Sequence, residues 1–263
     1  MADNIMSTGE EEAADSRGTK RKEMEDQKDE EDVQHVDQPE LKLYYFDIKG
    51  KGESIRLICA YSGLKLQDHR FESRDEFKAM KEGSRLPFGQ VPMLEVDGKV
   101  AMVQSTAIMR YLGKLSGLYP MKDHVLAQKV DAVMDQATDV FTGSTVLTYG
   151  LRYAIDLSPE AKEKSFEHYN QTVLPDHLKR AERIVGSSAT GWMAGTEEPS
   201  PADFVWYCSL TNMAAKKEIS EKNKTLESFP KLKAFLEKFE SLEAIKQYHN
   251  KEIEEENTVA LRI

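Results

Sequence analysis

The chain has 263 residues, of which 40% are hydrophobic, so it can bury one substantial core or two small ones. It has no apolar run approaching the roughly 18 residues of a membrane-spanning helix, and we expect no membrane partner. Its two cysteines, Cys59 and Cys208, exclude a scaffold held by several disulfides and fit a reducing, cytoplasmic setting.

The net charge of −10 is concentrated at the start of the chain. Residues 1–40 hold 14 acidic and 5 basic side chains, whereas the remainder holds 32 acidic and 31 basic ones. Residues 1–39 also lack aromatic side chains and carry few aliphatic ones, so they cannot bury enough apolar surface to offset their chain entropy. This composition predicts a disordered acidic tail. The acidity therefore describes the tail and says nothing about the ligand of the folded part, for which we expect no nucleic-acid partner.

Four elements are predicted before residue 83. The aromatic-rich stretch 41–46 predicts a strand. A helix follows over 53–61 and ends at Gly63, since glycine readily adopts the left-handed conformation of a helix end. A second strand over 64–71 and a short helix over 74–81 complete this part.

Three local signals follow each other within residues 86–113. Val91-Pro92 opens an apolar run, where proline suits the first residue of a strand and its peptide bond can be cis. Asp97-Gly98 between apolar residues predicts a hairpin. Gln104-Ser105 opens a helical pattern. The free N–H groups at a helix start suit a carboxylate, although such a pair can also simply cap the helix.

The resulting order, β-α-β-α-β-β-α, is that of a thioredoxin-like α/β domain, which we place at residues 40–117. The pattern from residue 121 onward is helical without a convincing strand. We therefore expect an all-α domain over 121–255 and a short C-terminal segment over 256–263.

The helical part carries its own local signals. A long helix is predicted over 121–149, with Val125 on its apolar stripe, and two shorter ones are predicted from Phe229 and over 242–250. Another helix begins at Pro159, and Pro175 should kink it or end a turn. Ser200-Pro201-Ala202-Asp203 is a capping box in type, so Asp203 is predicted to serve folding and not catalysis.

Two stretches carry a resemblance to a known family. LPFGQVPMLEVDGKVAMVQSTAIMRYLG, residues 86–113, resembles glutathione transferases, and YYFDIKGKGESIR, residues 44–56, is similar to the opening strand and turn of their sigma and alpha classes. The resemblance implies that Tyr45, which precedes Phe46, is catalytic. A phenol O–H donated to the sulfur of glutathione favours the thiolate and lowers the thiol pKa from its ordinary value of about 8.5. Tyr44 should face the opposite side of the strand.

The same resemblance implies a set of glutathione-binding residues. Gln104 and Ser105 would hold the γ-glutamyl carboxylate, and the backbone of Val91 would meet the cysteinyl unit. The full set is Tyr45, Lys51, Lys81, Gln90, Val91, Pro92, Gln104 and Ser105, together with Asp139 reaching across from a second subunit. Gln90 and Lys81 are expected near the glycyl end. Lys51 replaces an arginine that is common in these classes, which keeps the charge but loses the planar fork.

Asp131, Asp135 and Asp139 recur on one face of the long helix. They form either a solvated stripe or, by resemblance, part of a homodimer in which Asp139 reaches the partner's glutathione. A divalent cation at the dimer axis is an alternative, but Thr138 stands where one acid is expected. We expect no required metal. Phe88 is a candidate aromatic key between the subunits.

The resemblance thus implies a transferase that conjugates glutathione, its co-substrate, to hydrophobic electrophiles in detoxification. Two alternatives stay open. The first is a glutathione-dependent isomerase of the prostaglandin D synthase type, with Tyr149 and Tyr153 in its second pocket. The second is a non-catalytic structural or binding relative, like the S-crystallins.

Overall fold

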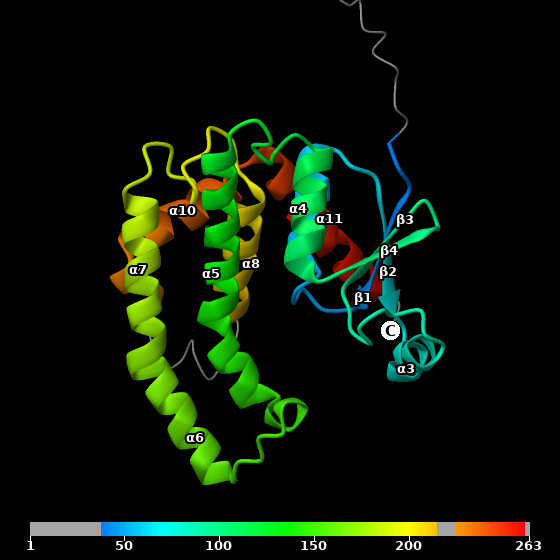
Figure 1. The fold of residues 1–263 in the computed structure, drawn as a ribbon, viewed down its shortest axis with the longest axis horizontal. Coiled ribbons are helices and arrows are strands. Elements are labelled where there is room, and N and C mark those ends of the chain that lie inside the picture. Colours follow the sequence, from blue (N-terminus) through cyan, green and yellow to red (C-terminus); the bar gives the residue numbers. More distant parts are fainter. Residues whose placement is uncertain (1–37, 215–224, 261–263) are drawn as a thin grey trace, which may run out of the picture. The chain divides into compact units, whose positions relative to one another are not determined.

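The first half of the chain forms a four-stranded sheet covered by helices. The computed structural model describes residues 38–214 and 225–260. The elements here are β1 (Leu41–Phe46), α2 (Glu53–Ser62), β2 (Leu66–Phe71), α3 (Arg74–Glu82), β3 (Met93–Val96), β4 (Val100–Val103) and α4 (Ser105–Leu115). The sheet order is β2-β1-β3-β4, with β1 and β2 parallel and the other pairs antiparallel (Figure 1). The predicted thioredoxin-like arrangement is confirmed.

The turns of this sheet follow from the local signals in the sequence. Asp97 and Gly98 both have positive φ, 53° and 63°, as a tight hairpin turn between β3 and β4 requires. The Asp97 carboxylate accepts a hydrogen bond from the Glu40 N–H at 2.9 Å, which ties the hairpin to the start of β1. The Val91-Pro92 peptide bond is cis, as predicted.

The second half is helical throughout its described residues. Its elements are α5 (His124–Thr148), the 3₁₀ turn Gly150–Tyr153, α6 (Pro159–His168), the π-helical turn Tyr169–Val173, α7 (Leu174–Gly186), α8 (Pro201–Ala214), the 3₁₀ turn Thr225–Ser228, α10 (Pro230–Glu240) and α11 (Glu243–Ala260). None of the described helices is long and apolar enough to cross a membrane.

Two details of these helices differ from the sequence predictions. Val125 is 81% exposed because it lies in the first turn of α5, where Asp123 caps the helix by accepting from the N–H groups of Val125 and Leu126. The last helix continues to Ala260, well past the predicted end at Asn250, since no glycine or proline interrupts residues 251–260. The proposed C-terminal segment therefore begins inside α11, and residues 261–263 lie outside the described part.

The predicted irregularity before Pro175 takes the form of the π-helical turn between α6 and α7. Tyr169 begins this turn and is buried, and its hydroxyl donates to the Val140 carbonyl oxygen of α5 at 2.6 Å. Gly143 makes room for the Tyr169 ring, since a Cβ there would lie 2.6 Å from Cε2. The proline and a small residue on the facing helix together allow this local change of helix geometry.

One hydrophobic core joins the two halves. It includes side chains of the sheet, α2, α4, α5 and α8, and Trp206 of α8 donates its indole N–H to the Val133 carbonyl oxygen of α5 at 2.8 Å. The start of α8 is built around the fully buried Asp203, as the capping box predicted. One Asp203 oxygen accepts from the Met193 N–H at 2.7 Å, and the other accepts from the N–H and hydroxyl of Ser200 at 2.8 and 2.9 Å.

Candidate active site

The sheet brings three of the residues predicted from the sequence together at one end of strands β1, β3 and β4. Tyr44 of β1 pairs with Met93 of β3, and Met93 pairs with Val103 of β4. One residue further along, the same row contains Tyr45, the cis-Pro92 and Gln104. Three segments that are far apart in the sequence therefore meet here because β3 is antiparallel to both of its neighbours.

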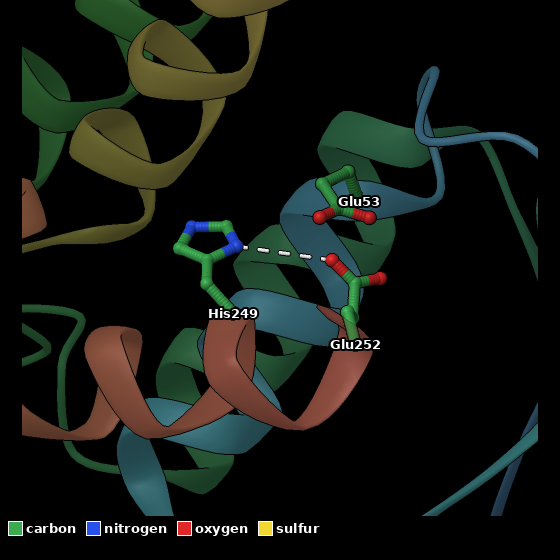
Figure 2. Close-up of side chains that lie close together, drawn as sticks. All are labelled: Glu53, His249 and Glu252. Atoms are coloured by element: carbon green, nitrogen blue, oxygen red, sulfur yellow. Dashed lines mark ion pairs between the residues drawn. The ribbon is translucent and has the colours of Figure 1, made fainter. Parts of the chain in front are cut away.

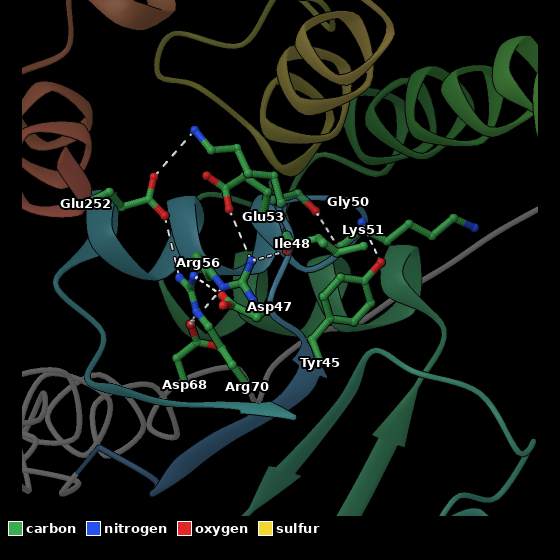
Figure 3. A network of polar contacts seen from close by, with 12 residues as sticks. Tyr45, Asp47, Ile48, Gly50, Lys51, Glu53, Arg56, Asp68, Arg70 and Glu252 are labelled. Carbon is green, nitrogen blue, oxygen red and sulfur yellow. Dashed lines mark hydrogen bonds and ion pairs between the residues drawn. The ribbon is translucent and has the colours of Figure 1, made fainter. Parts of the chain in front are cut away.

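Tyr45 faces the turn between β1 and α2, and its hydroxyl accepts a hydrogen bond from the Lys51 N–H at 2.9 Å (Figure 3). Two glycines let the turn close over the ring: a Cβ at Gly50 would lie 2.7 Å from the hydroxyl, and one at Gly52 would lie 2.5 Å from Cδ1. Burial raises the pKa of Tyr45, although the Lys51 hydrogen bond opposes this shift. The phenol is therefore protonated at neutral pH, and its O–H proton is free to be donated to a ligand.

Tyr44 lies on the other face of the sheet, as the strand alternation predicted. It belongs to a separate small cluster with Phe71 and Met93. Its hydroxyl accepts from Arg85 at 3.3 Å and lies 3.5 Å from a Glu95 carboxylate oxygen. Of the two adjacent tyrosines, Tyr45 alone faces the turn.

The residues that hold this turn in place were not predicted from the sequence. Arg56 is buried, and its guanidinium donates to the Ile48 carbonyl oxygen at 3.0 Å and pairs with the carboxylates of Glu53 and Asp68 at 3.2 and 2.9 Å (Figure 3). From α8, the Asn212 amide donates to the Gly50 carbonyl oxygen at 3.2 Å. The spacing Glu53-x-x-Arg56 at a helix start could have indicated the pair between Glu53 and Arg56. No local sequence signal indicates the contact between Asn212 and Gly50.

The start of α4 has the geometry of an anion site. Gln104 has φ 71° and ψ 108°, a backbone conformation that non-glycine residues rarely adopt and that is most common at functional sites. Within the described part of the chain, neither the Gln104 amide nor the Ser105 hydroxyl makes a hydrogen bond that caps the helix. Both groups therefore remain available to a carboxylate beside the positive end of the helix dipole.

Lys81 and Gln90 also lie near each other. The Lys81 side chain crosses Gly89, where a Cβ would lie 3.1 Å from its Cε, so the lysine stem passes directly beside the residue before Gln90. Val91 is half-buried and follows on the cis-proline loop. Lys51 contributes its backbone N–H to Tyr45, and any residue other than proline could supply that group.

The aspartate stripe of α5 divides into two parts. Asp131 and Asp135 both bind the Arg110 guanidinium, at 2.6 and 2.7 Å, so one internal cation already pairs with both carboxylates. Asp139 is exposed, and the structure does not bring it to the other predicted site residues of the same chain. Phe88 is 63% exposed.

Apolar side chains gather on the segment after α5. Tyr149, Leu151, Tyr153, Ile155 and Leu157 are large hydrophobic residues that are all exposed. This segment lies close enough to Tyr45 for Tyr149 and Arg152 to influence the pKa of its phenol. An apolar molecule bound here would lie next to a ligand held at Tyr45.

Comparisons with known proteins cover both halves. A family model for the N-terminal domain of glutathione S-transferase matches residues 41–114, and one for the C-terminal domain matches residues 150–252. The chain is 34% identical over 208 residues to hematopoietic prostaglandin D synthase of Gallus gallus, covering 79% of this chain and 94% of that protein. It is 37% identical over 160 residues to glutathione S-transferase 1 of Ascaris suum, covering 60% and 72%.

Solved structures agree with these sequence matches. The glutathione S-transferase from Ascaris lumbricoides superposes with a TM-score of 0.67 at 32% identity, covering 81% of this chain and 97% of that one. Prostaglandin synthase D of Nilaparvata lugens superposes with a TM-score of 0.69 at 28% identity, covering 81% and 98%.

Proposed function

The chain belongs to the glutathione S-transferase family, and we propose that Tyr45 activates the thiol of bound glutathione in this enzyme. The observation that carries the proposal is the hydrogen bond from the Lys51 N–H to the Tyr45 hydroxyl. Because this N–H occupies an acceptor position of the phenol oxygen, the phenol proton points away from the turn and can be donated to sulfur. A donated O–H stabilises the thiolate more than the thiol, so the thiol loses its proton at a lower pH.

The other predicted residues would hold the rest of glutathione. The γ-glutamyl carboxylate would bind at Gln104 and Ser105, and the backbone of Val91 before Pro92 would pair with the cysteinyl unit. Lys81 and Gln90 would meet the glycyl end. This assignment is supported by the strained Gln104 backbone and by the free groups at the start of α4. We assign glutathione binding to residues 40–117 and the electrophile to residues 121–255.

The reaction is attack of the thiolate on an electrophilic carbon. With an activated aryl chloride, a carbon–sulfur bond forms, the carbon–chlorine bond breaks and chloride leaves, so no enzyme-bound covalent intermediate is needed. A test is to mix the protein with glutathione and a dinitrophenyl chloride and follow the thioether product. Failure to form it despite glutathione binding would favour a non-catalytic relative. We propose detoxification of hydrophobic electrophiles in the cytoplasm as the biological role.

An isomerase of the prostaglandin D synthase type is the second candidate, favoured by the relatives of that name. It would use the same thiolate on an endoperoxide, with Tyr149 and Tyr153 beside the substrate. The test is incubation with a prostaglandin endoperoxide. Formation of prostaglandin D without net loss of glutathione supports the isomerase, whereas formation of a glutathione conjugate alone supports the transferase.

Binding of glutathione should depend on Ser105. We expect Ser105→Ala to raise the dissociation constant for glutathione about tenfold, since one hydrogen bond to a charged carboxylate is lost. The melting temperature should stay the same, because this hydroxyl makes no bond within the described residues. Calorimetric titration measures the affinity. Ser116→Ala, at the other end of α4, is the matched control, and an equal effect there would contradict the assignment.

We further propose that the enzyme is a homodimer in which Asp139 of each subunit meets the amino group of glutathione in the other. The exposed Phe88 and Asp139 support this arrangement. Sedimentation at micromolar protein should give a dimer, and Asp139→Asn should weaken glutathione binding several-fold. A monomer with unchanged affinity would contradict both parts.

A further inference from the structure

Three potential metal ligands meet between two helices outside the proposed glutathione site. Glu53 begins α2, while His249 and Glu252 lie one turn apart on α11 (Figure 2). One ligand atom from each lies within 4.8 Å of the others. The His249 Nδ1 is 3.7 Å from a Glu252 oxygen. Ligands of one zinc ion, each at about 2.0–2.2 Å, lie roughly 3.5 Å apart, so only small side-chain movements separate this cluster from a bound geometry.

Glu53 has an unused oxygen that is buried in this cluster. Its side chain is 5% exposed, and Oε1 has no hydrogen-bond partner among the described residues, whereas Oε2 is near Arg56 and Tyr248. A buried carboxylate oxygen without a partner costs free energy. A cation bound at Oε1 would remove this cost.

The side chain of Tyr207 contacts the His249 ring on the side away from Glu252. The Tyr207 hydroxyl lies 3.3 Å from the His249 Nε2 and donates to a Glu240 oxygen at 3.3 Å. This contact leaves the His249 Nδ1 on the side of the ring that faces Glu252, 3.7 Å from one of its oxygens. A hydrogen bond from the second ring nitrogen is the usual way in which a protein orients a ligating histidine.

Cationic side chains already touch the cluster and would compete with a metal. The Lys49 ammonium lies 3.5 Å from the Glu252 oxygen that faces His249, and Arg70 lies 3.5 Å from the other oxygen. The Lys49 side chain is 57% exposed, so it can move into solvent at little cost. Lys49 is therefore the contact that a metal would replace.

We infer that Glu53, His249 and Glu252 form a binding site for a divalent transition metal of the zinc type, which displaces Lys49 and fastens α11 to α2. One imidazole nitrogen and two carboxylates favour Zn²⁺ over Mg²⁺ or Ca²⁺, which prefer oxygen ligands alone. The site lies beside the turn that holds Tyr45, but its ligands do not include Tyr45 or the residues proposed to bind glutathione.

The test is titration of the untagged full chain with Zn²⁺ by calorimetry, and with Co²⁺ by absorption spectroscopy. We expect one equivalent per chain and visible bands of low-symmetry Co²⁺ with a nitrogen ligand. His249→Gln and Glu252→Gln should each weaken binding at least about tenfold. Lys49→Met should tighten it, because the internal competitor is gone. Zn²⁺ should also raise the melting temperature of the unmodified chain.

Matched variants test whether the effect is local. His124→Gln changes an exposed histidine on α5, and Glu243→Gln changes an exposed glutamate on α11, so both should bind Zn²⁺ as the unmodified chain does. Glu53→Gln would also disturb the ion pair with Arg56, so His249→Gln and Glu252→Gln are the decisive variants. Absence of one-to-one binding at micromolar Zn²⁺ overturns the inference. Zn²⁺ binding that survives both His249→Gln and Glu252→Gln overturns it too.

Discussion

Tyr45→Phe should return the thiol of bound glutathione to a pKa near its free value of about 8.5 and lower kcat by about 10- to 100-fold at neutral pH. The reason is the loss of one O–H donated to an anion, which stabilises the thiolate by about 1.5–3 kcal/mol. The ring and its packing against Gly50 and Gly52 remain. Thiolate absorbance of bound glutathione, followed against pH, measures the change directly.

Tyr44→Phe is the matched control for this experiment. Tyr44 lies on the opposite face of β1, so its loss should leave the thiol pKa unchanged. If the unmodified protein binds glutathione without lowering the thiol pKa, Tyr45 is not an activator, and the non-catalytic alternative becomes the better explanation.

Asp203→Ala should have the largest effect on stability, a loss of about 3–5 kcal/mol in the free energy of unfolding. The alanine would leave the N–H groups of Met193 and Ser200 buried without their acceptor. Denaturant unfolding at about pH 5 measures this loss. Asp123→Ala removes an exposed cap that also accepts two N–H groups, so it should cost only about 1 kcal/mol. Equal losses in the two variants would contradict the weight given to burial.

The pH dependence of stability checks the state of the same carboxyl. Burial raises the pKa of Asp203 to about 6, against about 3.9 in an unfolded chain. The folded state therefore holds the proton more tightly, and the stability from this group is complete below about pH 4 and is lost as the pH rises through about 6. Relative to Asp203→Asn, the unmodified chain should lose about 2–3 kcal/mol over this range. A difference between the two proteins that does not change with pH would contradict the raised pKa.

The parts of the fold that the sequence predicted depend on neighbouring residues. The Asp97-Gly98 turn, the cis bond at Pro92 and the capped start of α8 each need a backbone conformation that only a few residue types favour. The alternation along β1 correctly separated Tyr45 from Tyr44, because neighbouring strand residues face opposite sides. Together with the resemblance, these signals were enough to predict the fold and the face of β1 on which Tyr45 lies.

The parts that the sequence did not predict depend on residues that are distant along the chain. Asn212 reaches Gly50 across 162 positions, and Tyr248 reaches Glu53 across 195. No periodicity or cap encodes such contacts, since they arise only when helices of one half pack on elements of the other. The exposed Val125 has a related cause: its apolar spacing fits the stripe, but none of the described elements covers this side chain in the first turn of α5.

The turn that carries Lys51 is held from the helical half by three side chains, and this limits how the protein can be recombined with its relatives. Asn212 binds Gly50, Tyr248 binds Glu53, and Glu252 pairs with Lys49. A chimera that joins the first 117 residues to the helical half of another transferase would keep Tyr45 but lose these three supports, unless the donor supplies equivalents. Grafting Asn212 and Tyr248 along with the sheet would restore the two hydrogen bonds to Gly50 and Glu53.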